Sequence, residues 1–366
     1  MFIGKAARVI LTSAYFIILL LLVFWLYIIY VGWQHTDKQQ GSEQLYAAIA
    51  LWPMGLVDSI IRVLSIEAWF PVAGVFHFIP VAVAGALLHH LHNKTQPKYR
   101  RAGWITALLV IASIGAQVPL LLHPVNAENW ISTDLAGAPI QLWWIYLPYL
   151  VTLCCLLILS GQMLDIGRRY HKYLPWQSVD IHRYKISVIM LLAGCLLAVS
   201  LTGLLILVVI GAGGVAIEGW TLGIDLFCNM LLLFLLWSTV VAVHVLPSPI
   251  EYNRVFSASM KATERDTETL NRADKVMISG KCYKSIGLTI TEFARKAGVE
   301  PTDLLIALKR IKKHDFRGYI FHYRMEYARN VVMNTDTSIA NVAKRLGFNS
   351  EKFLSGAFLH YLEKRK

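Results

Sequence analysis

The chain has 366 residues, of which 56% are hydrophobic and only 16% are charged. A soluble globular domain carries about 25% charged residues, so the composition excludes an ordinary soluble protein and favours a membrane protein. The net charge of +12 is uneven, because residues 1–246 hold 13 Lys and Arg against 10 Asp and Glu, whereas residues 247–366 hold 22 against 13. An apolar half followed by a basic half indicates a membrane domain joined to a domain that binds nucleic acid or a lipid surface.

The first half contains apolar segments long enough to cross a bilayer, which takes roughly 20 residues each. We predict six spans, at Arg8–Trp33, Ala68–Leu91, Trp104–Leu122, Leu142–Met163, Ser187–Ile210 and Gly223–Leu246. The first of these exceeds the apolar core of a signal peptide, so we expect it to remain in the protein.

Loop charges predict the orientation of these spans. The loops at residues 93–103 and 165–186 carry four and five Lys and Arg, whereas the loops at 123–141 and 211–222 carry only acidic charges. Cytoplasmic loops are enriched in Lys and Arg, so the first two loops should be cytoplasmic and the last two external. Because Lys5 and Arg8 are also basic, we expect both termini to be cytoplasmic.

The segment Leu45–Ile66 is apolar enough to be a seventh span, but it contains Pro53, Asp58 and Arg62. A charge at the bilayer centre costs about 2.5–3.5 kcal/mol on insertion scales. We therefore expect a helix that lies at the outer interface or dips into the membrane and returns. A seven-span chain with an external N-terminus is the alternative.

Polar residues within apolar segments are candidates for a functional site. Asp58 and Arg62 are four residues apart, as are Asp225 and Asn229, so each pair shares one helix face. These residues either bond to neighbouring helices or form a small-ligand pocket near the outer face. The candidate sensing residues are Trp52, Asp58, Arg62, Glu67, Trp69, Asp225 and Asn229.

His89 and His92 share a helix face at a spacing that can hold a metal such as zinc. No second pair of ligands has a predictable position, so we interpret them as interfacial histidines and predict no metal or cofactor. The sequence contains no nucleotide-binding glycine loop, paired catalytic carboxylates or nucleophile motif. We therefore do not expect an enzyme.

The last span should end at Pro247 and Pro249, because proline interrupts a helix. A charged, helical connector is predicted to follow. From Leu288, "LTITEFARKAGVEPTDLLIALKRI" has the periodicity of two helices that meet in a turn at Gly298. A longer helix is expected at Phe316–Met333, and a second helix–turn–helix unit at Ser338–Tyr361.

Two helix–turn–helix units joined by a long helix resemble the AraC-type DNA-binding domain, through "LTITEFARKAGV", "FRGYIFHYRMEYAR" and "SIANVAKRLGFNS". The lead-in "ADKVMISGKCYKSIGLTI" is similar to that of AraC-type regulators whose N-terminal half is a multi-span membrane domain. The resemblance implies an all-α chain with a polytopic membrane sensor at 1–246, a connector at 247–285 and a DNA-binding domain at 286–366. It also implies a one-component transcription regulator of the bacterial inner membrane. Its expected partners are double-stranded DNA, a second copy of the chain, RNA polymerase, membrane lipids and an unidentified signal.

By this resemblance, the first reading helix would direct Thr302, Leu305 and Ile306 at bases, and the second would direct Lys352 and Ser355. The basic residues after the first reading helix should bind phosphates; they are Lys309, Arg310, Lys312 and Lys313. Ile306 and Gly356 stand where the family very often has Arg, and Leu359 and His360 replace a typical basic pair. Because the second unit lacks both the Arg and the basic pair, we expect the first unit, around Thr302–Lys313, to make most DNA contacts. The alternative is a tail that serves protein interaction or inner-leaflet anchoring instead of base-specific binding.

Overall fold

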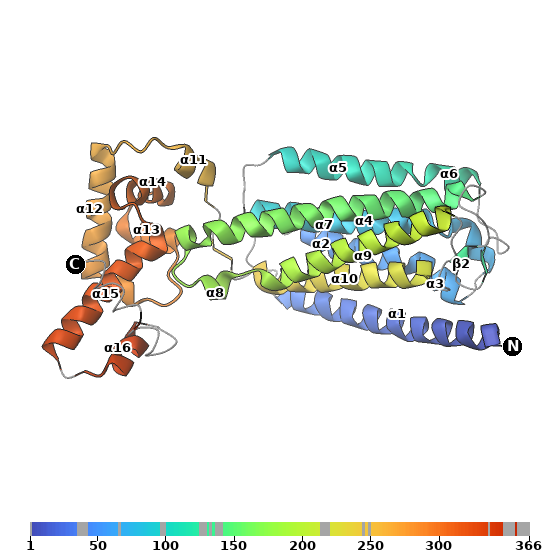
Figure 1. Ribbon diagram of the computed structural model, residues 1–366, viewed down its shortest axis with the longest axis horizontal. Helices are drawn as coiled ribbons and strands as arrows, with labels where there is room; N and C mark the ends of the chain where they lie inside the picture. Colours follow the sequence, from blue (N-terminus) through green and yellow to red (C-terminus); the bar gives the residue numbers. More distant parts are fainter. Residues whose placement is uncertain are drawn as a thin grey trace. The chain divides into compact units, whose positions relative to one another are not determined.

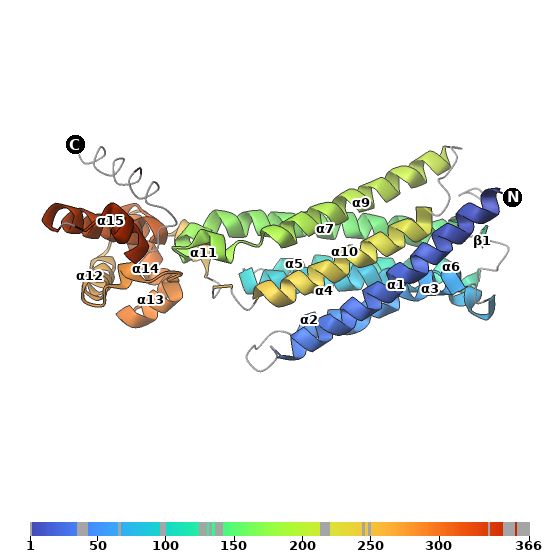
Figure 2. The same cartoon turned by 90° about the horizontal axis from the view of Figure 1, so that it is seen from below.

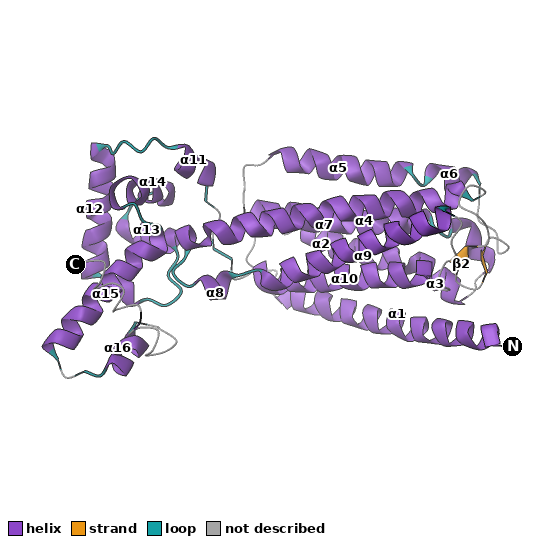
Figure 3. Cartoon of the chain, viewed as in Figure 1, coloured by secondary structure: helices purple, strands orange, loops and turns teal. Residues whose placement is uncertain are grey.

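The computed structural model describes residues 2–34, 43–64, 67–95, 100–123, 130–131, 134–135, 142–212, 220–243, 246–247, 250–335, 337–346 and 356. Nearly all of these residues are helical (Figure 3). The chain divides into two compact units. The first contains Met1–Lys94, Lys98–Gly167 and Ile186–His244, and the second contains Thr95–Pro97, Arg168–Lys185 and Val245–Lys366.

The first unit is a bundle of long helices (Figure 1). Its helices are α1 (Phe2–Gln34), α2 (Glu43–Leu51), η2 (Trp52–Leu56), α3 (Val57–Leu64), η3 (Glu67–Val72), η4 (Val75–His77), α4 (Phe78–Thr95), α5 (Arg100–Gly115), α6 (Val118–Leu122), α9 (Ser187–Gly211), α10 (Trp220–Val243) and most of α7 (Trp143–Gln177). A short antiparallel pair, β1 (Trp130–Ile131) and β2 (Asp134–Leu135), lies between α6 and α7 in the chain.

Among the described residues, seven helical segments are long and apolar enough to cross a membrane, which indicates a membrane protein. They are Thr12–Gln34, Glu43–Leu64, Val75–Thr95, Gly103–Leu122, Trp143–Gln177, Ser187–Gly211 and Trp220–Val241. Large apolar side chains on three of them face outward, with Leu20 65% exposed and Leu108 and Leu191 each 67% exposed. Such surfaces are costly in water and are suited to lipid.

The segment Glu43–Leu64, which the sequence favoured as an interfacial or dipping helix, is long and apolar enough to cross a membrane. It runs beside α1 in the opposite direction through the bundle (Figures 1 and 2). The indole Nε1 of Trp25 in α1 donates to the carbonyl oxygen of Ile49 at 2.8 Å. The interfacial prediction rested on the charges of Asp58 and Arg62. Both side chains face other helices and have partners there. The insertion cost of a lone charge therefore does not apply to them.

The second unit is also helical. It contains the end of α7 with α8 (Ile181–Tyr184), α11 (Tyr252–Ser257), α12 (Glu264–Ser279), η6 (Cys282–Lys284), α13 (Ile290–Ala297), α14 (Pro301–Ala307), the π-helical turn η7 (Leu308–Lys312), α15 (Phe316–Asn334) and α16 (Ile339–Arg345).

Local sequence explains where the helices of the second unit begin and end. The Thr263 hydroxyl caps α12 by accepting from the Asp266 backbone N–H, and the Asp266 carboxylate accepts from the Thr263 N–H in return. Gly298 ends α13 at φ 65°, a left-handed conformation that glycine adopts without strain. Pro301 opens α14 in the first turn, where its missing N–H costs nothing.

The segment Arg168–Lys185, expected as a loop between spans, belongs to the core of the second unit. Tyr173 and Trp176 pack against that core. The Val179 N–H donates to the carbonyl oxygen of Leu288 at 3.2 Å, and the Tyr184 hydroxyl donates to that of Gly287 at 2.9 Å. The second unit is therefore built from stretches that lie far apart in the chain.

Candidate sensing cluster and candidate nucleic-acid interface

A buried polar cluster lies within the first unit, between α3, α7 and α10. Arg62 of α3 is its centre, with a side chain only 1% exposed. Its guanidinium forms an ion pair with Asp225 of α10 and donates to the Thr221 hydroxyl at 3.0 Å and the Asp58 carbonyl oxygen at 3.3 Å. Burying a guanidinium is tolerable only when it is paired and hydrogen-bonded in this way.

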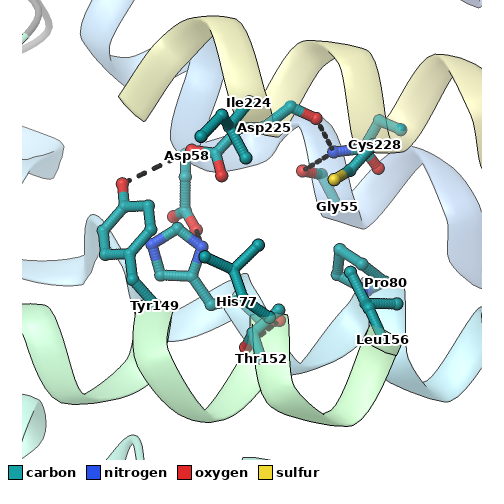
Figure 4. Close-up of a pocket in the computed structure, with 12 residues that line it drawn as sticks. Gly55, Asp58, His77, Pro80, Tyr149, Thr152, Leu156, Ile224, Asp225 and Cys228 are labelled. Atoms are coloured by element: carbon teal, nitrogen blue, oxygen red, sulfur yellow. Dashed lines mark hydrogen bonds and ion pairs between the residues drawn. The ribbon is translucent and has the colours of Figure 1, made fainter. Parts of the chain in front are cut away.

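Asp58 is the second buried carboxylate of the cluster. Its Oδ1 accepts from the Gly74 N–H at 2.8 Å, and its Oδ2 lies 3.7 Å from Nδ1 of His77. The His77 ring packs on Tyr149 of α7 with centroids 4.1 Å apart, and the Tyr149 hydroxyl donates to Asp225 at 3.4 Å. Asp58, His77 and Tyr149 therefore point toward one another across the bundle (Figure 4).

The cluster borders a cavity of about 20 Å³, which has room for about one water molecule. Its lining residues are Gly55, Asp58, His77, Pro80, Tyr149, Thr152, Leu153, Leu156, Ile224, Asp225, Cys228 and Asn229. Pockets for drug-sized ligands are about 300–1,000 Å³. In this conformation the cluster can therefore enclose a water molecule or a small ion, but not the larger ligand that the sequence suggested.

Charge balance determines what the cluster can do chemically. Asp58 and Asp225 supply two carboxylates against the single guanidinium of Arg62. Because buried charges are tolerated only when they are paired, the cavity beside these two carboxylates is better suited to a water molecule or a small cation than to an anion.

The predicted sensing residues are only partly brought together. Trp52 joins the cluster, because its Nε1 donates to the Asn229 carbonyl oxygen at 2.9 Å. The Asn229 side chain donates in turn to the carbonyl oxygens of Gly55 and Asp225, at 3.2 and 2.9 Å. Trp69 is 55% exposed and is absent from the cavity lining. The Glu67 side chain lies outside the described part of the chain.

His77 and Tyr149 were not among the candidates. His77 gave a weak signal in the sequence, as a single polar residue in an apolar run. Tyr149 gave none, because a tyrosine in a span is ordinary. Within the described residues, no group of three or more His, Cys, Asp or Glu is arranged to hold a metal.

The three residues expected to contact bases are buried in the second unit. Thr302 is 5% exposed, Leu305 is 0% exposed and Ile306 is 7% exposed. Leu305 and Ile306 are members of the hydrophobic core of that unit. In this conformation none of the three side chains is available to a base edge.

The basic residues that follow α14 fall into two pairs. Lys309 donates through Nζ to the carbonyl oxygens of Val255 and Phe256, at 3.0 and 3.1 Å, and Arg310 pairs with Asp266 at 2.8 Å. Lys312 and Lys313 are exposed, although Nζ of Lys312 approaches Asp274 at 3.9 Å. Lys352 and Ser355, the candidates from the second reading helix, lie outside the described residues.

Charged groups of the second unit, such as Asp266 and Arg324, form hydrogen bonds within that unit. Burial raises the pKa of Asp266, but hydrogen bonds from Thr263 and Arg310 outweigh burial and hold this pKa below its ordinary value. Burial lowers the pKa of Arg324 to about 10, so its guanidinium stays charged at neutral pH. Arg324 donates to the carbonyl oxygens of Tyr283 and Ser285, at 2.8 and 3.1 Å, and so fixes the link between α12 and α13.

The chain was compared with protein families, curated proteins and solved structures. No family model, curated protein or solved structure matches it.

Proposed function

We propose that the chain is a membrane-embedded one-component transcription regulator, which senses a signal in its first unit and binds DNA with its second. The observation that carries the proposal is the order of elements after residue 288. Helix α13, the Gly298 turn, α14, the long α15 and α16 follow one another in the order that the AraC-type resemblance implies.

Charge supports DNA as the partner of the second unit. Residues 247–366 hold 22 Lys and Arg against 13 Asp and Glu. Positive side chains that neutralise DNA phosphates release counterions, which supplies affinity at low salt. Lys312, Lys313 and Arg317 are exposed just after α14 and are suited to that role.

We propose that the first unit crosses a bacterial inner membrane seven times, with the second unit in the cytoplasm. The crossing added to the six expected spans is Glu43–Leu64, which carries Trp52, Asp58 and Arg62 of the buried polar cluster. Seven crossings put the two ends of the chain on opposite sides of the membrane. The basic residues of 93–103 and 165–186 remain on the cytoplasmic side, in agreement with the positive-inside rule, whereas Lys5 and Arg8 fall on the external side against it.

The proposed function can be tested with the intact protein in lipid nanodiscs. Sheared genomic DNA from the source organism is incubated with the nanodiscs at about 100 mM salt, and retained fragments are sequenced. Retained fragments should share a common motif and lie upstream of genes. The matched control is Lys312→Glu/Lys313→Glu, which should lower recovery of all fragments. Retention without any shared motif would refute base-specific regulation.

The second candidate is a tail that anchors on anionic lipid or binds another protein. The burial of Thr302, Leu305 and Ile306 favours it, because α14 then lacks base-reading side chains. Lysine acetylation of intact protein in anionic and in zwitterionic nanodiscs separates this candidate from DNA binding. Protection of Lys312 and Lys313 in anionic discs alone, together with a DNA selection that yields no motif, would favour anchoring.

A further inference from the structure

Helix α14 is covered over most of its surface, and only Pro301 and Asp303 are partly exposed. Leu304, Leu305 and Ala307 are each 0% exposed, and Ile306 is 7% exposed. Successive residues of an α-helix are rotated by about 100°, so four consecutive buried positions enclose the whole circumference. A helix that enters the major groove has to present one face to the bases. In this conformation α14 has no such face.

Part of the cover is α11, together with the stretch that links it to α12. Val255 of α11 is fully buried and belongs to the same core cluster as Leu305 and Ile306. Lys309 caps the end of α11 through the carbonyl oxygens of Val255 and Phe256, and its Nζ lies 5.3 Å from the Phe256 ring centroid. These contacts hold α11 against the segment that the resemblance assigns to DNA.

Charged contacts reinforce the same interface. Asp303, a partly exposed residue of α14, accepts from Arg254 at 3.1 Å and from Arg265 at 2.7 Å. Both arginines are largely exposed, so each of these ion pairs is weak. The pair between Arg310 and Asp266 is more enclosed, and Arg310 also donates to the Ser259 carbonyl oxygen at 2.7 Å. Two basic residues expected at phosphates are thus occupied by the connector.

On its other side, α11 packs against the end of α7. The Tyr173 ring stacks on Tyr252 with centroids 4.5 Å apart and lies 5.1 Å from Phe256. Trp176 meets Phe256 edge-on at 5.4 Å. Helix α11 is therefore held between α7 and α14, all within the second unit. The same α7 carries Tyr149, a residue of the sensing cluster, in its membrane portion.

We propose that α11 and its link to α12 form an intramolecular cover that competes with DNA for α14. The conformation described is the covered, low-affinity state, and DNA binding requires α11 to leave α14. A displacement of the α7 end would weaken the aromatic stack and release the cover. This inference rests on the proposed role of α14 as a DNA-reading helix.

The test compares Phe256→Ala with wild type, as intact protein in nanodiscs, by fluorescence anisotropy of a labelled 30-base-pair duplex at low salt. Phe256 contacts α7 and Lys309 but is 38% exposed, so its truncation should loosen the cover without unfolding the core. Kd for DNA should fall about tenfold, which corresponds to about 1.4 kcal/mol. The matched control is Tyr327→Ala, which removes a ring that packs at a tilt against Tyr283 in the same unit, with centroids 5.4 Å apart, and should leave Kd unchanged.

A second measurement uses wild-type protein only, in case Phe256→Ala does not fold. Hydrogen exchange of the peptide at residues 250–258 should become faster when saturating DNA is added. Slower or unchanged exchange there, or an unchanged Kd for a folded Phe256→Ala, would overturn the cover while leaving DNA binding intact. If wild type binds no duplex and Phe256→Ala binds none either, the proposed function itself fails along with the cover.

Discussion

Replacing Arg62 by Met should destabilise the first unit strongly. Methionine has nearly the length of arginine, so the change removes the charge without opening a large cavity. The lost contacts are those with Asp225, Thr221 and the Asp58 carbonyl oxygen. Two carboxylates then remain in the bundle without their guanidinium. Removing one partner of a buried ion pair costs about 3–5 kcal/mol, and we expect the unfolding free energy to fall by that amount.

The matched control removes the other partner as well. Asp225→Asn alone should also destabilise, because it leaves Arg62 charged with its principal partner gone. In the double variant Arg62→Met/Asp225→Asn neither charge remains, and replacing a whole buried pair is often close to neutral. The double variant should therefore lose less unfolding free energy than the two single variants lose together. The difference is a coupling energy of about 2–3 kcal/mol.

Unfolding can be followed by tryptophan fluorescence and circular dichroism as intact protein in mixed micelles is titrated with sodium dodecyl sulfate. The four proteins of the cycle are measured under identical lipid and detergent conditions. An Arg62→Met variant within about 1 kcal/mol of wild type would refute the reasoning. So would strict additivity of the single variants, because it would mean that Arg62 and Asp225 do not stabilise each other.

Three further predictions concern topology, pH and salt. A tag at the N-terminus and a tag at the C-terminus of the intact chain should be digested from opposite faces of oriented vesicles, and digestion from one face would favour six crossings. Asp266→Asn should cost the second unit about 1–3 kcal/mol at pH 7. Because the folded pKa of Asp266 lies below its ordinary 3.8, the difference in thermal stability from wild type should persist above that pH and vanish as the pH falls through the folded pKa. Lys312→Ala/Lys313→Ala should weaken binding to unrelated duplexes equally and lower the salt slope of log Kd by about 2; an unchanged slope would exclude these lysines as phosphate contacts.

Local signals in the sequence predicted the helices after residue 288 closely. The long helix was expected at Phe316–Met333 and is found at Phe316–Asn334. Gly298 and Pro301 marked the turn before α14 because each has one strong backbone preference. The second of the two helices predicted around Gly298 changes at Leu308 into a π-helical turn, a difference of hydrogen bonding that residue periodicity does not reveal.

Distant pairings were beyond the sequence argument. The burial of Arg62 in the segment Glu43–Leu64 depends on its ion pair with Asp225, which is 163 residues away in the chain. Periodicity within one segment contains no information about such a partner. The charges were therefore weighed as if they faced lipid.

The burial of α14 could have been anticipated. Leu304–Leu308 is an unbroken apolar run, and a helix that is apolar on all sides is usually buried. The family resemblance instead predicted that side chains of this run contact bases. The segment Arg168–Lys185 gave a similar signal through Tyr170, Tyr173 and Trp176, whose spacing repeats with the helical turn.

Under the proposed function, the assembly of the second unit from distant stretches of the chain has a consequence for proteolysis. A protease that cut near Pro247 would sever the C-terminal stretch from the segment Arg168–Lys185. That segment supplies Tyr173 and Trp176, which pack against the core, and Tyr184, which donates to the Gly287 carbonyl oxygen. The released fragment would expose the aromatic face of α11 and lose part of its fold. Under the proposed function, the chromosome therefore has to come to the membrane.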